Sequence, residues 1–117
     1  MQGLHSPHQN KLLAAIPTAE YGQLFGDLEL VPMKLGQILY EPGVQMRHAY
    51  FPTTAVISLH YVNEAGASAE MAAVGPEGLI GIALFMGGGS TTGSAMVRTA
   101  GHGYQLGRNA LMRAFMD

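Results

Sequence analysis

The stretch AYFPTTAVISLHYVNEAGASAEMAAV, residues 49–74, decides the fold class. Tyrosine, phenylalanine, valine and isoleucine are concentrated in residues 49–52 and 55–63, and these residue types favour β-strands. Residues 63–66 are typical of a hairpin loop, and residues 68–74 follow as the second strand of that hairpin. The stretch therefore predicts consecutive short strands joined by tight connections.

Further short strands are expected on both sides of this stretch. Upstream, residues 37–41 are followed by Pro42 and Gly43; downstream, residues 94–100 and 103–106 are the next candidates. Seven or eight short strands separated by glycine or proline, with no long helix among them, indicate a barrel or a jelly roll. We therefore predict a mainly β fold.

Helices are expected before the strands. Asn10 can cap a helix over residues 11–16, which Pro17 would end, and Thr18 can cap a second helix over residues 18–28. In the second helix the apolar residues recur at helical spacing, at Tyr21, Leu24, Phe25 and Leu28. Residues 1–9 are expected to be a flexible N-terminus.

A last helix is expected over residues 109–117, capped by Asn109, with Met112 and Met116 on an exposed apolar stripe. An acidic residue, Asp117, at its end opposes the helix dipole, and no glycine or asparagine cap follows. We therefore expect the natural chain to continue past Asp117.

Composition limits the classes of function. The chain has 117 residues, enough for one domain, with 48% hydrophobic and only 12% charged residues, so we expect a compact globular protein. Six basic residues are scattered through a chain of net charge -2, which argues against a DNA-binding face. The absence of cysteine excludes disulfides and thiolate metal sites. With no secretion signal or apolar run of about 20 residues, a soluble, cytoplasmic protein is expected.

Glycine is dense between Gly75 and Gly93, with seven glycines in nineteen residues. Such a segment can bring backbone N–H groups close to a phosphate or another anion, or it can simply form tight turns. Neither a Walker lysine nor a dinucleotide fingerprint accompanies these glycines. The number of glycines by itself therefore favours tight turns over an anion-binding loop.

Several motifs in one order resemble the sensor domain of Crp/Fnr-type transcription regulators. They are EPG at residues 41–43, YFPT at 50–53, GPEGLIG at 75–81 and SAMVRTAG at 94–101, and the resemblance runs from about Asn10 to Asp117. It implies a cyclic-nucleotide-binding-like domain over residues 1–117: a double-stranded β-helix (jelly roll) with short N-terminal helices. It also implies a short helix inside the phosphate-binding cassette and the start of a C-terminal helix.

The resemblance also implies where a ligand would bind. The candidate ligand-binding residues are Gly81, Ile82, Ala83, Leu84, Gly93, Ser94 and Ala95. Nucleotide-binding members carry a glutamate where this chain has Ile82 and an arginine where it has Gly93. Losing two charge-assisted contacts weakens binding on the order of a hundredfold or more, so cyclic AMP is not the favoured ligand. Backbone N–H groups at Ile82 and Ala83, with the Ser94 hydroxyl, remain for an anion.

Other polar and charged residues have a structural role as the alternative to a functional one. Arg98 lies four residues after Ser94 and so shares its strand face, where it either reaches a large ligand or forms an ion pair. Glu77 is most simply a turn residue. The histidines are His5, His8, His48, His60 and His102, and their spacing does not match a cupin metal site. No arrangement of serine, histidine and acid suggests a nucleophile, so no enzyme is predicted.

The sequence thus predicts a ligand-sensing regulatory domain that binds a small molecule, nucleotide-like or otherwise anionic, in a degenerate cassette. The resemblance implies that the parent protein contacts DNA through a domain absent from this chain and that the parent is a homodimer. No membrane partner is expected. Two alternatives stay open: a ligand-free protein-interaction domain of the same fold, and a cupin-like metal-binding β-barrel.

Overall fold

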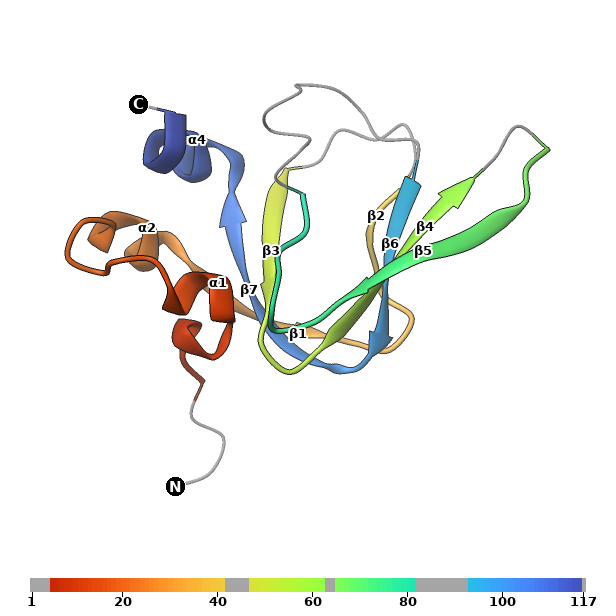
Figure 1. The fold of residues 1–117 in the computed structure, drawn as a ribbon, viewed down its shortest axis with the longest axis horizontal. Coiled ribbons are helices and arrows are strands. Elements are labelled where there is room, and N and C mark those ends of the chain that lie inside the picture. Colours follow the sequence, from red (N-terminus) through yellow and green to blue (C-terminus); the bar gives the residue numbers. More distant parts are fainter. Residues whose placement is uncertain (1–4, 42–46, 63–64, 82–92, 117) are drawn as a thin grey trace.

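The computed structural model describes residues 5–41, 47–62, 65–81 and 93–116. This part of the chain contains seven strands in two antiparallel sheets, with short helices beside one sheet (Figure 1). The strands are β1 (Glu29–Met33), β2 (Ile38–Tyr40), β3 (His48–Pro52), β4 (Val56–Val62), β5 (Ser68–Val74), β6 (Gly93–Thr99) and β7 (Gly101–Gly107). The expected mainly β, jelly-roll fold is confirmed.

The chain crosses repeatedly between the two sheets. Sheet 1 has the order β1-β7-β3 and sheet 2 the order β2-β6-β4-β5. Within the described residues, β4 and β5 are the only consecutive strands that pair; this is the predicted hairpin, and it projects from the body of the domain in Figure 1. Because most neighbouring strands are distant in sequence, long-range contacts hold the sheets together.

Four helical segments are described: η1 (Pro7–Gln9), a 3-10 turn, and the α-helices α1 (Lys11–Ala14), α2 (Gly22–Asp27) and α4 (Arg108–Met116). The turn η1 falls within the N-terminal segment expected to be flexible, and Ser6 caps it. Among the helices of the described ranges, none is long and apolar enough to span a bilayer.

The helices begin and end differently from the prediction in two places. Asn10 caps α1 as predicted, but α1 ends at Ala14 rather than at residue 16. Thr18 does not cap α2, because its hydroxyl contacts the His8 ring at 3.3 Å. The Pro17 carbonyl instead accepts the N–H groups of Glu20 and Tyr21, and this turn delays the helix until Gly22.

The C-terminal helix also differs from the prediction. Helix α4 starts at Arg108, directly after β7, so Asn109 lies inside the helix and is not its cap. Met112 is half-buried against the apolar cluster under the helices, so the expectation that it is exposed was wrong. The side chain of Met116 lies outside the described residues.

Two apolar clusters form the core, one on each face of sheet 1. The first, the helical core, contains Phe51, Tyr104 and Leu106 from the sheet and Leu13, Leu24 and Leu111 from the helices. The second, the inner core, lies between the sheets and contains Met33, Ile57, Ala95 and Val97. The alternation of side chains along each strand therefore sends one set to the helices and the other set to the space between the sheets.

Gly103 shows how closely the inner core is packed. A Cβ atom at this position would lie 2.6 Å from Met33 Cε and 2.9 Å from the Phe51 carbonyl oxygen. Only glycine lets these neighbours approach the centre of sheet 1.

Candidate functional site

The glycine-rich segment begins with a tight turn after β5. The Gly78 N–H donates to the Gly75 carbonyl at 3.2 Å, and the Glu77 carboxylate accepts the Gly75 N–H at 3.1 Å. The hydrogen bond from the Gly75 N–H is the main reason why the pKa of the Glu77 carboxyl is below its ordinary value. The structure therefore gives Glu77 the turn role that the sequence favoured.

Beyond the turn, the chain runs beside β3. The Tyr50 N–H donates to the Ile80 carbonyl at 3.0 Å, and the Ile80 N–H donates back to the Tyr50 carbonyl at 2.9 Å. Gly81 comes next, with a φ of 108°, a conformation that residues with a side chain rarely adopt. The segment is therefore fixed against sheet 1 up to Gly81.

The far end of the segment begins in the other sheet. Gly93, Ser94 and Ala95 form the start of β6, where Ser94 pairs with His60 and Ala95 with Leu59. Ala95 is fully buried in the inner core, and strand alternation puts Gly93 on the same inner face. The same alternation puts Ser94 on the outer face of sheet 2, so the backbone of Ser94 is closer to the inner space than its hydroxyl.

Three predicted ligand-binding residues, Ile82, Ala83 and Leu84, lie outside the described residues, as does the expected cassette helix. The described ones, Gly81 and Gly93 to Ala95, flank the undescribed residues 82–92 and stand on opposite sheets.

Arg98 belongs to the outer face of sheet 2. Its guanidinium lies 3.5 Å from the Glu70 carboxylate, and both side chains are largely exposed. Glu70 also accepts a hydrogen bond from the Ser58 hydroxyl. Because the ligand-facing residues would be on the inner face, Arg98 has the ion-pair role that the sequence left open.

A pocket of about 390 Å³ opens between the two sheets. Its walls are apolar at Val31, Met33 and Leu39 and polar at Tyr50 and Gln105; Pro32, Lys34 and Gln37 complete the lining. We call it the inner pocket. Small-molecule sites have this size and this mixture of apolar walls with a few polar groups.

The polar lining residues Tyr50 and Gln105 belong to a cross-strand row whose third member, Glu29, lies outside the lining of the inner pocket. Gln105 on β7 is the register partner of both Glu29 on β1 and Tyr50 on β3. The Gln105 amide donates to the Glu29 carboxylate at 2.6 Å. Burial raises the pKa of Tyr50, so its phenol stays protonated at neutral pH and can both donate and accept a hydrogen bond.

Sequence reasoning missed Tyr50 and Gln105 as site residues. Tyr50 stood in an aromatic strand and Gln105 was one polar residue between Tyr104 and Leu106, so each was consistent with an ordinary strand. The signal that could have found them is alternation: both neighbours of Gln105 are core residues, which leaves Gln105 facing the other side.

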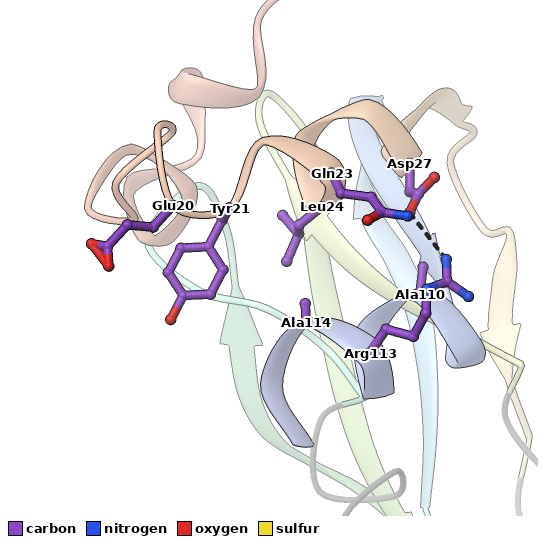
Figure 2. Close-up of a pocket in the computed structure, with 8 residues that line it drawn as sticks. All are labelled: Glu20, Tyr21, Gln23, Leu24, Asp27, Ala110, Arg113 and Ala114. Carbon is purple, nitrogen blue, oxygen red and sulfur yellow. Dashed lines mark hydrogen bonds and ion pairs between the residues drawn. The ribbon is translucent and has the colours of Figure 1, made fainter. Parts of the chain in front are cut away.

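Two further pockets lie beside α4, on the helical side of sheet 1. The smaller, about 180 Å³, is the space between α2 and α4 shown in Figure 2, with Tyr21, Leu24 and Ala114 among its lining residues. The larger, about 590 Å³, lies around the start of α4. Asp27 and Arg113 line both pockets, and their side chains form an ion pair at 3.3 Å.

The histidines are dispersed in the described structure. The His5 ring lies against that of His102 at a tilt of 41°, His8 stacks on Phe25, and His48 lies near Tyr50. Within residues 5–41, 47–62, 65–81 and 93–116, no three histidine, cysteine or acidic side chains are grouped as metal ligands would be. A cupin-like metal site therefore has no support from the described residues.

Comparison with solved structures identifies the fold. The N-terminal domain of a Streptomyces coelicolor transcriptional regulator matches with a TM-score of 0.75 and 24% identity, over 94% of this chain and 77% of that one. The regulatory domain of Toxoplasma gondii protein kinase A, crystallised with cAMP, matches with a TM-score of 0.80 and 13% identity, over 92% of this chain and 41% of that one. The fold is that of a cyclic-nucleotide-binding domain. The resemblance to Crp/Fnr-type sensor domains is thus confirmed at the level of the fold.

A third neighbour with the cyclic-nucleotide-binding fold has a different ligand. The regulatory subunit of a cAMP-independent protein kinase A from Trypanosoma cruzi, bound to guanosine, matches with a TM-score of 0.82 and 15% identity, over 92% of this chain and 38% of that one. The chain thus spans about two-fifths of each kinase regulatory protein. The neighbours named here are regulatory domains or subunits. No protein-family model and no curated protein sequence matches the chain.

Proposed function

We propose that this chain is a ligand-sensing regulatory domain whose small-molecule ligand occupies the inner pocket. The observation that carries the proposal is the double role of Tyr50. Its side chain lines the inner pocket, while its backbone is bonded to Ile80, the residue before Gly81. A ligand that contacts Tyr50 is therefore adjacent to the glycine-rich segment at Ile80 and Gly81, and its binding can bias the arrangement of that segment.

The chemistry of the inner pocket favours a nucleoside-like or other polar ligand over cyclic AMP. A cyclic phosphate needs a guanidinium, yet the position that faces the inner space at the start of β6 is Gly93. Lys34 is the one basic residue among the described lining residues. Gln105 and Tyr50, both in the lining, offer an amide and a phenol, which suit hydroxyl groups and a base edge. The guanosine-bound Trypanosoma cruzi neighbour supports this ligand class.

The proposal extends to the longer protein. As a signal-input module of a transcription regulator, the domain would act on DNA only through a separate domain, and the parent would be a homodimer. The fold neighbours from bacterial transcription regulators support this role. The reading frame after Asp117 tests it: a helix-turn-helix within about 100 residues is expected.

Isothermal titration calorimetry with guanosine, adenosine, cyclic GMP and cyclic AMP tests the ligand proposal. We expect a nucleoside to bind at least as tightly as either cyclic nucleotide. Tyr50→Phe should weaken that binding by about twofold to tenfold, the effect of one hydrogen bond. Tyr104→Phe is the matched control, because Tyr104 is on the same sheet but faces the helical core. Equal weakening by both variants would contradict the assignment of the inner pocket.

A gain-of-function variant tests whether Ile82 and Gly93 occupy the positions of the charged residues in nucleotide-binding members. Restoring the two missing charges with Ile82→Glu and Gly93→Arg should improve cyclic AMP binding on the order of a hundredfold. Cyclic AMP that binds the unmodified chain more tightly than guanosine would show that the alignment of Ile82 and Gly93 is wrong.

A further inference from the structure

The charged end of the inner pocket is the turn between β1 and β2. Lys34 is the one charged residue among the described lining residues of this pocket, and Gln37 belongs to the same turn. The other polar lining residues, Tyr50 and Gln105, are uncharged at neutral pH. The lining therefore has two polar regions of different chemistry.

The two polar regions are separated along β1. Gln105 pairs with Glu29 at the start of β1, whereas Lys34 directly follows Met33 at its end. The five residue steps from Glu29 to Lys34 (34 − 29 = 5) span roughly 16 Å of extended chain at about 3.3 Å per residue. The flexible lysine side chain can reach back over part of this distance. A ligand that contacts both regions is therefore elongated, with an uncharged polar end and an anionic end.

Hydrogen bonds hold the turn from Lys34 to Gln37 in place. The Gln37 N–H donates to the Lys34 carbonyl at 2.9 Å, and Gly36 has a φ of 82°, which glycine adopts readily at the third position of a turn. The Gly36 N–H donates to the Val97 carbonyl at 2.9 Å, and the Val97 N–H donates to the Gln37 carbonyl at 2.8 Å. Val97 is fully buried in the inner core, so the turn has a well-packed support.

The side chain of Gln37 has a defined orientation. Its Oε1 accepts the Lys34 N–H at 2.9 Å, so its NH2 group is the part of the amide that remains to donate. In the described part of the chain, neither this NH2 group nor the Lys34 ammonium has a hydrogen-bond or ion-pair partner. The acidic residues outside the described part are Glu64 and Asp117. An amide NH2 and an ammonium from one turn are donors that suit a single anionic group.

Building on the proposed function of the inner pocket, we propose that Lys34 and Gln37 bind the anionic group of its ligand, and that this ligand is a nucleoside 5′-monophosphate. A phosphate monoester carries close to two negative charges at neutral pH. It also extends away from the ribose, whereas a cyclic phosphate carries one charge and is held against the ribose ring. The turn would then supply the positive charge that Gly93, at the start of β6, lacks.

Isothermal titration calorimetry of the whole chain with guanosine, guanosine 5′-monophosphate and cyclic GMP tests the proposal. At low ionic strength the 5′-monophosphate should bind about threefold to tenfold more tightly than guanosine, a modest gain because Lys34 is exposed to solvent. In about 1 M salt, where charges are screened beyond about 3 Å, this gain should disappear. Guanosine is neutral, so it serves as the internal reference for every variant.

Two variants of the turn should remove the gain. Lys34→Gln removes the charge, so the affinities for guanosine 5′-monophosphate and guanosine should become equal within about twofold. Gln37→Glu keeps an oxygen for the Lys34 N–H but replaces the NH2 donor with a carboxylate oxygen, which should make the 5′-monophosphate the weaker ligand. Lys11→Gln is the matched control, because it removes the same charge from α1, on the helical side of sheet 1. Far-UV circular dichroism and the thermal midpoint identify any variant that is not folded.

The outcomes separate this proposal from the proposed function. A gain that is lost in both turn variants and kept in Lys11→Gln supports the role of the turn. Guanosine or cyclic GMP that binds as tightly as the 5′-monophosphate overturns this role and leaves the inner pocket as a nucleoside site. An equal loss in Lys34→Gln and Lys11→Gln overturns it as well. If neither guanosine nor its 5′-monophosphate binds, the nucleoside-like ligand of the proposed function and the role of the turn are both wrong.

Discussion

Replacing Asn10 with alanine should destabilise this domain more than any other substitution of a single polar side chain near the N-terminus. Asn10 is fully buried and uses its whole side chain. Its Oδ1 accepts the N–H groups of Leu12 and Leu13, and its Nδ2 donates to the carbonyls of Pro52 at 2.7 Å and Gly78 at 2.8 Å. It thereby joins α1, the end of β3 and the turn before Gly81.

The magnitude follows from these contacts. Loss of the cap costs about 1 kcal/mol, and each buried carbonyl left without a donor costs about 1–3 kcal/mol. The sum is about 3–7 kcal/mol, and because the contacts of one side chain are not additive we expect the lower part of this range, about 3–5 kcal/mol. A domain of this size has about 6–18 kcal/mol of total stability, so Asn10→Ala should remain folded but with a large shift in its denaturation midpoint.

Urea unfolding followed by circular dichroism measures the effect. With a slope of about 1–3 kcal/mol per molar urea, the midpoint should fall by at least about 1 M. Asn109→Ala is the control, because Asn109 is exposed on α4 and its replacement should change the free energy of unfolding by less than about 0.5 kcal/mol. A loss below about 1 kcal/mol for Asn10→Ala would refute the interpretation of Asn10 as the junction of three segments.

Asn10→Asp refines the test through pH. The aspartate keeps the cap acceptor but places a carboxylate against two carbonyl oxygens in a buried site, which raises its pKa in the folded state above the unfolded value of about 3.9. A raised folded pKa means that stability is present below the unfolded pKa and is lost as pH rises through the folded pKa. The deficit of Asn10→Asp relative to the natural chain should therefore shrink as pH falls from 7 toward 4. A deficit that is constant over this range would contradict the two donor contacts of Asn10.

Three further predictions concern stability. Gly81→Ala should lower the free energy of unfolding by about 1–3 kcal/mol because of its φ of 108°. Gly26→Ala, in the last turn of α2 where a Cβ meets open space, should raise it by about 0.5–1 kcal/mol; chemical denaturation of both variants checks the contrast. Gly103→Ala should cost about 1–3 kcal/mol because its methyl group meets Met33 and the Phe51 carbonyl, and an unchanged thermal midpoint would be inconsistent with that packing. Glu77→Gln should be less stable than the natural chain at neutral pH. A lowered folded pKa gives a contribution that is fully present above the unfolded pKa of Glu77 and is lost as pH falls through the folded pKa, so the difference should decrease over that acidic range; thermal melts from neutral to acidic pH decide the point.

The elements with a strong local signal were predictable from the sequence. The hairpin of β4 and β5 shows in the strand-forming residues and the turn between them, and the Asn10 cap shows in a polar residue placed before a short apolar run. The turn at Glu77 and the glycine at position 81 likewise reflect backbone preferences of single residues. These features depend on contacts between residues that are close in sequence, so sequence patterns indicate them directly.

Tertiary structure decided the start of α2, the burial of Met112 and the composition of the inner pocket. Thr18 could cap a helix by local rules, but the His8 ring, ten residues away, takes its hydroxyl. Met112 is covered because α4 packs against a core built from both ends of the chain. Tyr50 and Gln105 meet because β3 and β7, some fifty residues apart, lie in register. Strand pairing between distant segments sets which side chains share a face, and no local sequence pattern encodes that choice.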